Sequence, residues 1–288
     1  MKADALLHTV QEILTQDTAR LTQALAVDAT TARIEVQSLL QKVTQKPRAW
    51  LLAHAAESLA AAQQVEYAAL LQRRLQGEPV AYILGEREFF GLMFQVTPAT
   101  LIPRPETELL AELALQRIPV TQSMSVLDLG TGSGAVALAI AHARPAAQVS
   151  ACDVSAAALA VAQNNAQRLG IHNAAFLHSD WFAAFGTQRF DLIVSNPPYV
   201  AAGDPHLRQG DLRFEPACAL ASGVDGLCDI RHIASQARAH LEADAWLLLE
   251  HGYDQGEQVR ELLGAEGYRE IFTARDLAGV ERASGARA

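Results

Sequence analysis

The segment Asn196-Pro197-Pro198-Tyr199 combines residue types that suit holding a planar NH2 group. It follows an apolar run over residues 190–194, which predicts a short buried strand. Proline lacks an N–H and fixes φ, so neither proline can continue a sheet ladder. The strand therefore ends in a stiff segment that presents an amide side chain, backbone carbonyls and an aromatic ring. The alternative interpretation is a proline-containing turn with a capping asparagine.

A glycine-rich loop lies between a predicted strand and a predicted helix, and reads Gly130-Thr131-Gly132-Ser133-Gly134. Glycines allow the backbone to approach a ligand closely at a helix N-terminus. Asp153 follows the last of these glycines by 153 − 134 = 19 residues, at the end of the next predicted strand. An acidic side chain in that place accepts hydrogen bonds from ribose hydroxyls in doubly wound nucleoside-binding folds. A strand-end turn or a helix cap is the alternative role for Asp153.

The spacing of the glycines separates two classes of cofactor. A dinucleotide fingerprint reads G-x-G-x-x-G, whereas this loop together with Asp128 reads D-x-G-x-G-x-G. That pattern resembles motif I of class I S-adenosylmethionine-dependent methyltransferases. The resemblance implies S-adenosylmethionine as cofactor, S-adenosylhomocysteine as product, and a ribose contact from Asp153. It also implies that Asp180 accepts from the adenine amino group while Trp181 supplies an apolar wall, although Trp181 could instead be a packed core residue.

In methyltransferases with this fold, N-P-P-Y after the fourth strand marks transfer to a planar nitrogen of adenine, cytosine or a glutamine amide. Such a nitrogen is a weak nucleophile because its lone pair is delocalised. The Asn196 side-chain oxygen and the Pro197 carbonyl would accept its two N–H protons and stabilise the developing positive charge. Tyr199 would stack on the planar group, with Pro198 beside it as a further substrate contact. Asn196 also belongs to the expected cofactor-binding set, and the cationic methyl donor makes a metal ion unnecessary.

The elements that must position these residues alternate between strands and helices, which predicts an α/β fold with a doubly wound, mostly parallel sheet. The resemblance implies a seven-stranded Rossmann-like methyltransferase sheet over residues 105–288. Strands are predicted at 125–129, 148–152, 175–177, 190–194, 245–250 and 268–272. Helices are predicted at 135–143, 155–169, 229–241 and 254–263.

Residues 1–76 are rich in Ala, Leu and Gln with apolar positions at helical spacing, which predicts a smaller bundle of four or five helices. Its basic pair, Arg73-Arg74, is interpreted as a solvated helix face. Residues 77–104 predict a β-hairpin linker. The loop over residues 200–222 is long enough to be a functional flap beside a site.

The chain has 288 residues, enough for one large domain or two ordinary ones. Its net charge is 23 − 32 = −9, which argues against a protein that mainly binds nucleic-acid phosphates. The three cysteines are scattered, which argues against disulfides or a zinc site and indicates a reducing compartment. Neither a signal peptide nor a membrane-spanning run is apparent, so we expect a cytoplasmic protein with no membrane or nucleic-acid partner.

Several further segments together resemble the PrmC/HemK family of release factor glutamine methyltransferases. They lie at residues 77–85, 87–92, 101–108, 204–207, 213–216 and 248–252. The resemblance implies N5-methylation of the glutamine in the Gly-Gly-Gln motif of peptide chain release factors 1 and 2, with the helical bundle recognising the substrate. It leaves open whether Arg104, held between two prolines, contacts substrate or braces the pocket. An N6-adenine nucleic-acid methyltransferase and a binding protein without catalysis are the alternatives.

Overall fold

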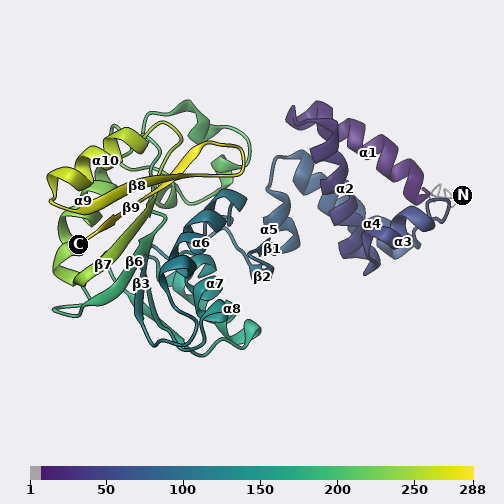
Figure 1. Ribbon diagram of the computed structural model, residues 1–288. Helices are drawn as coiled ribbons and strands as arrows, with labels where there is room; N and C mark the ends of the chain where they lie inside the picture. Colours follow the sequence, from purple (N-terminus) through teal and green to yellow (C-terminus); the bar gives the residue numbers. More distant parts are fainter. Residues whose placement is uncertain (1–7) are drawn as a thin grey trace, which may run out of the picture. The chain divides into compact units, whose positions relative to one another are not determined.

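The computed structural model describes residues 8–288 (Figure 1). Its contacts divide the chain into two compact units, Met1–Gly85 and Glu86–Ala288, which we call the helical unit and the sheet unit. The boundary between them falls inside residues 77–104, the range predicted to link two domains.

The helical unit contains five helices among its described residues. Four lie within residues 1–76, in agreement with the predicted bundle, and the fifth lies in the range 77–104 that was predicted as a hairpin linker. Its core is formed by apolar side chains spaced three and four residues apart, such as Val36, Leu39 and Leu40. Asp28 caps the second helix by accepting from the backbone N–H groups of Thr30 and Thr31. The helices are α1 (Val10–Leu25), α2 (Ala29–Thr44), α3 (Arg48–Ala53), α4 (Ala61–Leu75) and α5 (Val80–Leu84).

Arg74 corrects one interpretation of the sequence. It is 3% exposed and forms an ion pair with the buried Glu35, with Nε 2.8 Å from Oε2. The same guanidinium donates to the carbonyls of Gly77 and Glu78, just beyond the end of α4. Arg73 is half exposed and pairs with Glu78. Arg74 is therefore a buried structural residue and not part of a solvated face. A guanidinium can be buried when its N–H donors are all hydrogen-bonded.

The sheet unit begins with the predicted hairpin, formed by β1 (Glu86–Phe89) and β2 (Leu92–Gln95). The strands are antiparallel and joined by Phe90 and Gly91, which both have positive φ. Positive φ at both loop residues is typical of a type I′ turn. The backbone twist of this turn matches the twist of the two strands in a two-residue hairpin. Phe89 and Phe94 are buried in the core of the sheet unit.

The main sheet has seven strands in the order β5-β4-β3-β6-β7-β9-β8. The first five are mutually parallel, and β9 runs antiparallel to both of its neighbours, which confirms the mostly parallel sheet. The strands are β3 (Ser125–Leu129), β4 (Gln148–Asp153), β5 (Ala174–His178), β6 (Phe190–Ser195), β7 (Leu241–Glu250), β8 (Arg269–Arg275) and β9 (Glu281–Arg287). The sequence patterns had placed six of them and left β9 without a position.

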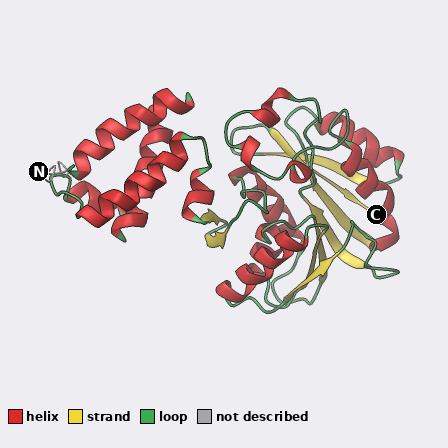
Figure 2. Cartoon of the chain, turned by 180° about the vertical axis from the view of Figure 1, so that it is seen from behind, coloured by secondary structure: helices red, strands yellow, loops and turns green. Residues whose placement is uncertain are grey.

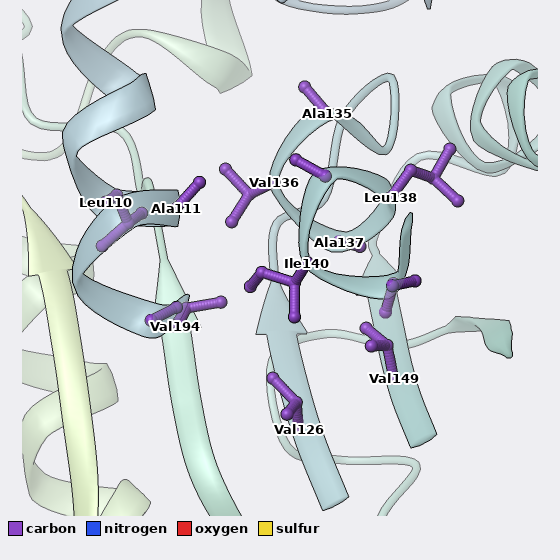
Figure 3. Packing of buried hydrophobic residues seen from close by; sticks show 14 of the residues in the cluster. Leu110, Ala111, Val126, Ala135, Val136, Ala137, Leu138, Ile140, Val149 and Val194 are labelled. Atoms are coloured by element: carbon purple, nitrogen blue, oxygen red, sulfur yellow. The ribbon is translucent and has the colours of Figure 1, made fainter. Parts of the chain in front are cut away.

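Helices cover both faces of this sheet (Figure 2). Successive residues of a strand point to opposite faces, so Val126 joins the core under one helix layer while Leu127 joins the core under the other. In Figure 3, Ile140 and Leu110 approach Val126 and Val194 on the first of these faces. That layer consists of α6 (Glu108–Arg117), α7 (Ala135–Ala143) and α8 (Ala156–Leu169), and the opposite layer of α9 (Cys228–Ala237) and α10 (Gly256–Ala265).

The strand order places the candidate residues together. The chain runs outward from β3 through β4 to β5 and then returns to the other side of β3 as β6. Ligands bind at the carboxyl ends of the strands where the winding direction changes in this way. Leu129 lies opposite Cys152 of β4 and Ser195 of β6, so the loops after these three strands leave the same edge of the sheet.

Candidate active site

A cavity of about 280 Å³ lies at this edge of the sheet. The loops after β3, β4 and β5 contribute to its wall, together with the segment before α6 and parts of the long loop after β6. Most of the predicted site residues line it: Arg104, Asp128, Gly130, Thr131, Gly132, Ser133, Asp153, Asp180, Trp181, Asn196 and Pro198. Gly134, Pro197 and Tyr199 do not belong to this lining.

The glycine loop is held by Asp153. The Gly132 N–H donates to Asp153 Oδ2 at 2.9 Å, and the Ser155 N–H donates to Oδ1 at 2.8 Å. Each carboxylate oxygen has a second lone pair, so both remain able to accept from ligand hydroxyls. Asp153 therefore combines the turn-forming role with a position on the cavity wall, and the two interpretations of this residue are compatible.

Gly134 has a packing role at the start of α7. Its φ is +83°, and a Cβ there would lie 3.1 Å from the Cβ of Ala162 and 3.1 Å from Leu138 Cδ1. A side chain at this position would push α7 away from α8, because close-packed interiors give little room. The third glycine of the motif thus shapes the loop by allowing helix packing and lies outside the cavity lining.

Asp128 is a buried carboxyl at the base of the loop, 2% exposed. Burial raises its pKa to about 7, although the Thr131 hydroxyl opposes this by donating to Oδ2 at 2.6 Å. The short contact fixes the turn that carries Thr131 into the cavity wall. The carboxyl is therefore a structural anchor of the loop as well as part of the site.

Trp181 lies where both of its predicted roles apply. Its indole ring covers the glycine loop, because a Cβ built on Gly130 would lie 3.6 Å from the ring atom Cζ3. The ring also packs against the buried cluster under α9 and α10. Trp181 has a positive φ of 46°, a conformation that is uncommon for a bulky residue, and it lines the cavity.

Asn196 follows β6 and is partly buried at the cavity wall. Its Nδ2 donates to the Thr107 hydroxyl at 3.2 Å. Among the residues that the structure describes, no group donates to its Oδ1. The amide thus faces Thr107 with its donor end and leaves an acceptor for a ligand N–H, which is the arrangement that binding of a planar NH2 group requires.

Tyr199 is half-buried and donates its hydroxyl to Glu250 Oε1 at 3.2 Å. Burial and the nearby Glu250 charge raise the pKa of this phenol, so it stays protonated. The Tyr199 carbonyl in turn accepts from Gln255 Nε2 at 3.0 Å. These contacts fix the aromatic end of the N-P-P-Y segment, and stacking of the ring on a substrate stays a prediction.

Arg104 forms an ion pair with Glu215, whose side chain is fully buried. Glu215 Oε2 also accepts from the Ile102 N–H at 3.0 Å. The pair ties the segment before α6 to the predicted flap, which places Pro216, Cys218 and Ala219 on the cavity wall. Arg104 thus braces the pocket, and a direct contact between it and a substrate stays a prediction.

Three contributors to the site were not predicted from the sequence: Thr107, Glu215 and Glu250. All three belong to segments that were recognised, but no chemical role was assigned to them. The position of Glu250 directly after the apolar run 245–249 is the signal that could have identified it, because a polar residue at the carboxyl end of a strand reaches the same edge as Asn196.

Within residues 8–288, no group of His, Cys, Asp or Glu side chains is arranged to hold a metal ion. The same residues contain no helix that is both long and apolar enough to cross a membrane.

The sheet order, the glycine loop and the polar groups at the strand ends define a Rossmann-like methyltransferase. The model of the methyltransferase small domain matches residues 106–212, and that of the PrmC N-terminal domain matches residues 12–85. Two solved structures share this fold. A Pyrococcus furiosus methyltransferase is 17% identical with a TM-score of 0.52 and covers 76% of this chain and 98% of its own. A T. thermophilus 16S rRNA N2 G1207 methyltransferase is 21% identical with a TM-score of 0.52. The match covers 70% of this chain and 49% of that protein.

Curated relatives are more specific. The Pseudomonas aeruginosa protein called release factor glutamine methyltransferase is 50% identical to this chain, over 88% of this chain and 92% of its own length. The Bordetella pertussis protein of that name is 50% identical over 92% and 98%, and the Escherichia coli protein is 48% identical over 87% and 90%. The chain belongs to the release factor glutamine methyltransferase family, and the resemblance noted in the sequence is confirmed.

Proposed function

We propose that this enzyme transfers a methyl group from S-adenosylmethionine to the side-chain amide nitrogen (N5) of the glutamine in the Gly-Gly-Gln motif of peptide chain release factors 1 and 2. Family membership supports the substrate class. The observation that carries the proposal is the Asn196 amide, whose donor end is held by Thr107, in a residue that lines the cavity together with the glycine loop. Since release factors act in translation, the cytoplasm is the expected compartment.

The cavity suits a nucleoside with a positively charged sulfonium. Gly130 and Gly132 leave the loop backbone open, Asp153 keeps lone pairs for ribose hydroxyls, and Trp181 offers a flat apolar surface. When bound there, S-adenosylmethionine would supply an electrophilic methyl group. This cofactor assignment is supported by the residue types and by the fold.

In this reaction the main tasks of the protein are to position the substrate amide and to polarise its nitrogen. Asn196 Oδ1 and the Pro197 carbonyl would accept the two N–H protons of the substrate amide, which favours localisation of the nitrogen lone pair and stabilises positive charge as it develops. Holding the nitrogen in line with the donor removes much of the entropic barrier. The stiff Pro197-Pro198 backbone keeps the acceptors in place without an induced rearrangement.

The role of Asp153 can be tested by the change Asp153→Ala. We expect the dissociation constant for S-adenosylmethionine to rise about 10- to 100-fold, because charge-assisted hydrogen bonds to ribose and the tether to Gly132 are lost together. Isothermal titration measures this directly. Asp254→Ala, at an exposed carboxylate, is the matched control. An unchanged affinity in Asp153→Ala would show that this carboxylate only shapes the turn.

The helical unit is proposed to recognise the release factor. A chain that begins at Glu86 keeps the whole cavity, since every residue lining it lies in the sheet unit. We expect this truncated chain to bind S-adenosylmethionine nearly as well as the full chain and to bind the release factor much more weakly. Titration with each ligand separates the two effects, and an undiminished affinity for the release factor would contradict the recognition role.

The activity itself is tested with labelled S-adenosylmethionine and three acceptors: a release factor, the same factor with its motif glutamine replaced, and DNA. The expected result is label in the unmodified factor alone. Label in DNA would favour the nucleic-acid alternative, and label that persists in the substituted factor would place the reaction at another residue.

A further inference from the structure

Four polar side chains follow one another behind the candidate catalytic amide, and a hydrogen bond joins the two residues at each end of this path. Asn196 Nδ2 donates to Thr107 Oγ1 at 3.2 Å, and Tyr199 donates its hydroxyl to Glu250 Oε1 at 3.2 Å. Thr107 also lies close enough to Glu250 for its hydroxyl to stabilise the carboxylate charge. The path therefore leaves the N-P-P-Y segment at Asn196 and returns to it at Tyr199.

Glu250 lies at the centre of this path and is almost fully buried, at 2% exposure. It is the last residue of β7, where Leu249 is paired with Ser195, one residue before Asn196. Its Oε2 is buried and has no hydrogen-bond partner among the described residues. A buried carboxylate oxygen without a donor is costly, so it favours any nearby hydroxyl that can turn its hydrogen toward it.

The direction of the hydrogen bonds follows from this demand. A hydroxyl has one hydrogen to donate. If Thr107 gives that hydrogen to Glu250, its oxygen can only accept, and the group of Asn196 that faces it must be the NH2. The Asn196 oxygen then points to the other side. With the hydrogen bonds in that direction, the charge on Glu250 would determine which end of the amide meets the substrate.

We propose that Glu250, acting through Thr107, is the positioning residue that keeps the Asn196 carbonyl oxygen turned toward the substrate amide. This inference rests on the proposed function, because it concerns a substrate that offers N–H donors. A protonated or amide side chain at position 250 would donate to Thr107 instead. Thr107 would then donate to the Asn196 oxygen, and the amide would present its own NH2 to the substrate NH2, so that two donors would meet.

The groups around Glu250 make this orientation dependent on pH. Burial raises the pKa of Glu250 to about 7, the hydrogen bonds from Thr107 and Tyr199 and the charge of Arg282 on β9 oppose that rise, and the charge of Glu106 adds to it. His251, the next residue, is buried and its pKa is lowered, so it adds no positive charge near neutral pH. Glu250 consequently gains its proton as the pH falls through about 7.

The test compares kcat for release factor methylation in the wild-type enzyme and Glu250→Gln at saturating substrates. At pH 8 we expect the variant to be slower by about 10- to 100-fold, by analogy with the loss caused when a partner that orients a metal ligand is removed. The ratio of the two rates should shrink as the pH is lowered to 6, because wild-type Glu250 then also carries a proton. A purely structural role would leave the ratio independent of pH. Glu242→Gln, at an exposed carboxylate on the same strand, is the control.

Two Thr107 variants test the same path if Glu250→Gln does not fold. Thr107→Ser keeps the hydroxyl and should retain most of the rate, whereas Thr107→Val keeps the shape and should lose about as much as Glu250→Gln. Equal rates in wild type and Glu250→Gln at pH 8, a ratio that does not change with pH, or full activity in Thr107→Val would overturn the inference. Absence of release factor methylation by the wild-type enzyme is the separate result that would defeat the proposed function itself.

Discussion

Replacing Asn196 with alanine is expected to lower kcat about 100- to 1,000-fold, the loss typical of removing one preorganised polar group from a reacting centre. Asn196 lines the cavity together with the glycine loop, and its Nδ2 is held by Thr107. Alanine removes the side-chain acceptor and leaves the loop around Gly130 and Asp153 unchanged. Single-turnover kinetics with a release factor measures the loss, and titration measures the affinity for S-adenosylmethionine, which should be largely retained.

Asn164→Ala is the matched control for this prediction, because Asn164 is an exposed asparagine on α8 outside the cavity lining. It should leave kcat unchanged. If Asn196→Ala turned over at the wild-type rate, accepting a hydrogen bond at this position would have no part in catalysis. A variant that failed to bind S-adenosylmethionine would instead assign Asn196 mainly to cofactor binding.

Glu250→Gln is expected to stabilise the folded protein at alkaline pH even though it impairs the reaction. The folded-state pKa of Glu250 is raised from its ordinary 4.5 to about 7, so the ionised form is disfavoured by folding. The contribution of Glu250 to the unfolding free energy is therefore complete below about pH 4.5, and it is lost as the pH rises through about 7. The raised pKa corresponds to about 3 kcal/mol of unfolding free energy lost by the wild type. Glutamine does not titrate and avoids this loss.

Urea denaturation at a series of pH values measures this effect. The unfolding free energy of Glu250→Gln minus that of the wild type should grow by about 3 kcal/mol between about pH 4 and about pH 8. Asp128, whose pKa is also raised to about 7 by burial, titrates in both proteins and cancels in the difference. Glu242→Gln gives the pH dependence caused by losing an exposed carboxylate. A difference that is constant with pH would mean that Glu250 does not titrate across this range.

Much of the fold could be predicted because its elements carry strong local signals. The helix at 135–143 follows a glycine loop and is apolar except for His142, and the structure has it at the same residues. The strand at 125–129 has Val126, Leu127 and Leu129 buried, and the structure has it at the same residues as predicted. The glycine spacing and the N-P-P-Y segment predicted which strand ends would meet, and both now lie on one cavity wall.

The strand β9 could not be placed because its residues lack the signal of a buried strand. Glu281–Arg287 contains charged and small residues, and Gly285 is required by packing: a Cβ there would lie 2.4 Å from Phe272 Cε1. Such closeness depends on a neighbour far along the chain. Arg74 was misinterpreted for a similar reason, since its partner Glu35 is 39 residues away.

The orientation of the side chains in the site could likewise not be predicted from local sequence patterns. Thr107, Glu215 and Glu250 act through partners brought from distant segments, with Thr107 and Asn196 separated by 89 residues. The segment at 101–108 thereby gains a clear physical role. Arg104 fixes the flap through Glu215, and Thr107 accepts a hydrogen bond from the Asn196 amide. Sequence motifs identified these residues as a group, and the structure shows which of them contact one another.

The most direct test of the central claim locates the methyl group on the product. After incubation of the enzyme with S-adenosylmethionine and a release factor, the factor is digested and the modified peptide is sequenced by fragment mass spectrometry. The account predicts one added methyl on the side-chain nitrogen of the glutamine in the Gly-Gly-Gln motif, and none with Asn196→Ala under the same conditions. A methyl group on any other residue, or on the motif glutamine at undiminished yield with Asn196→Ala, would contradict it.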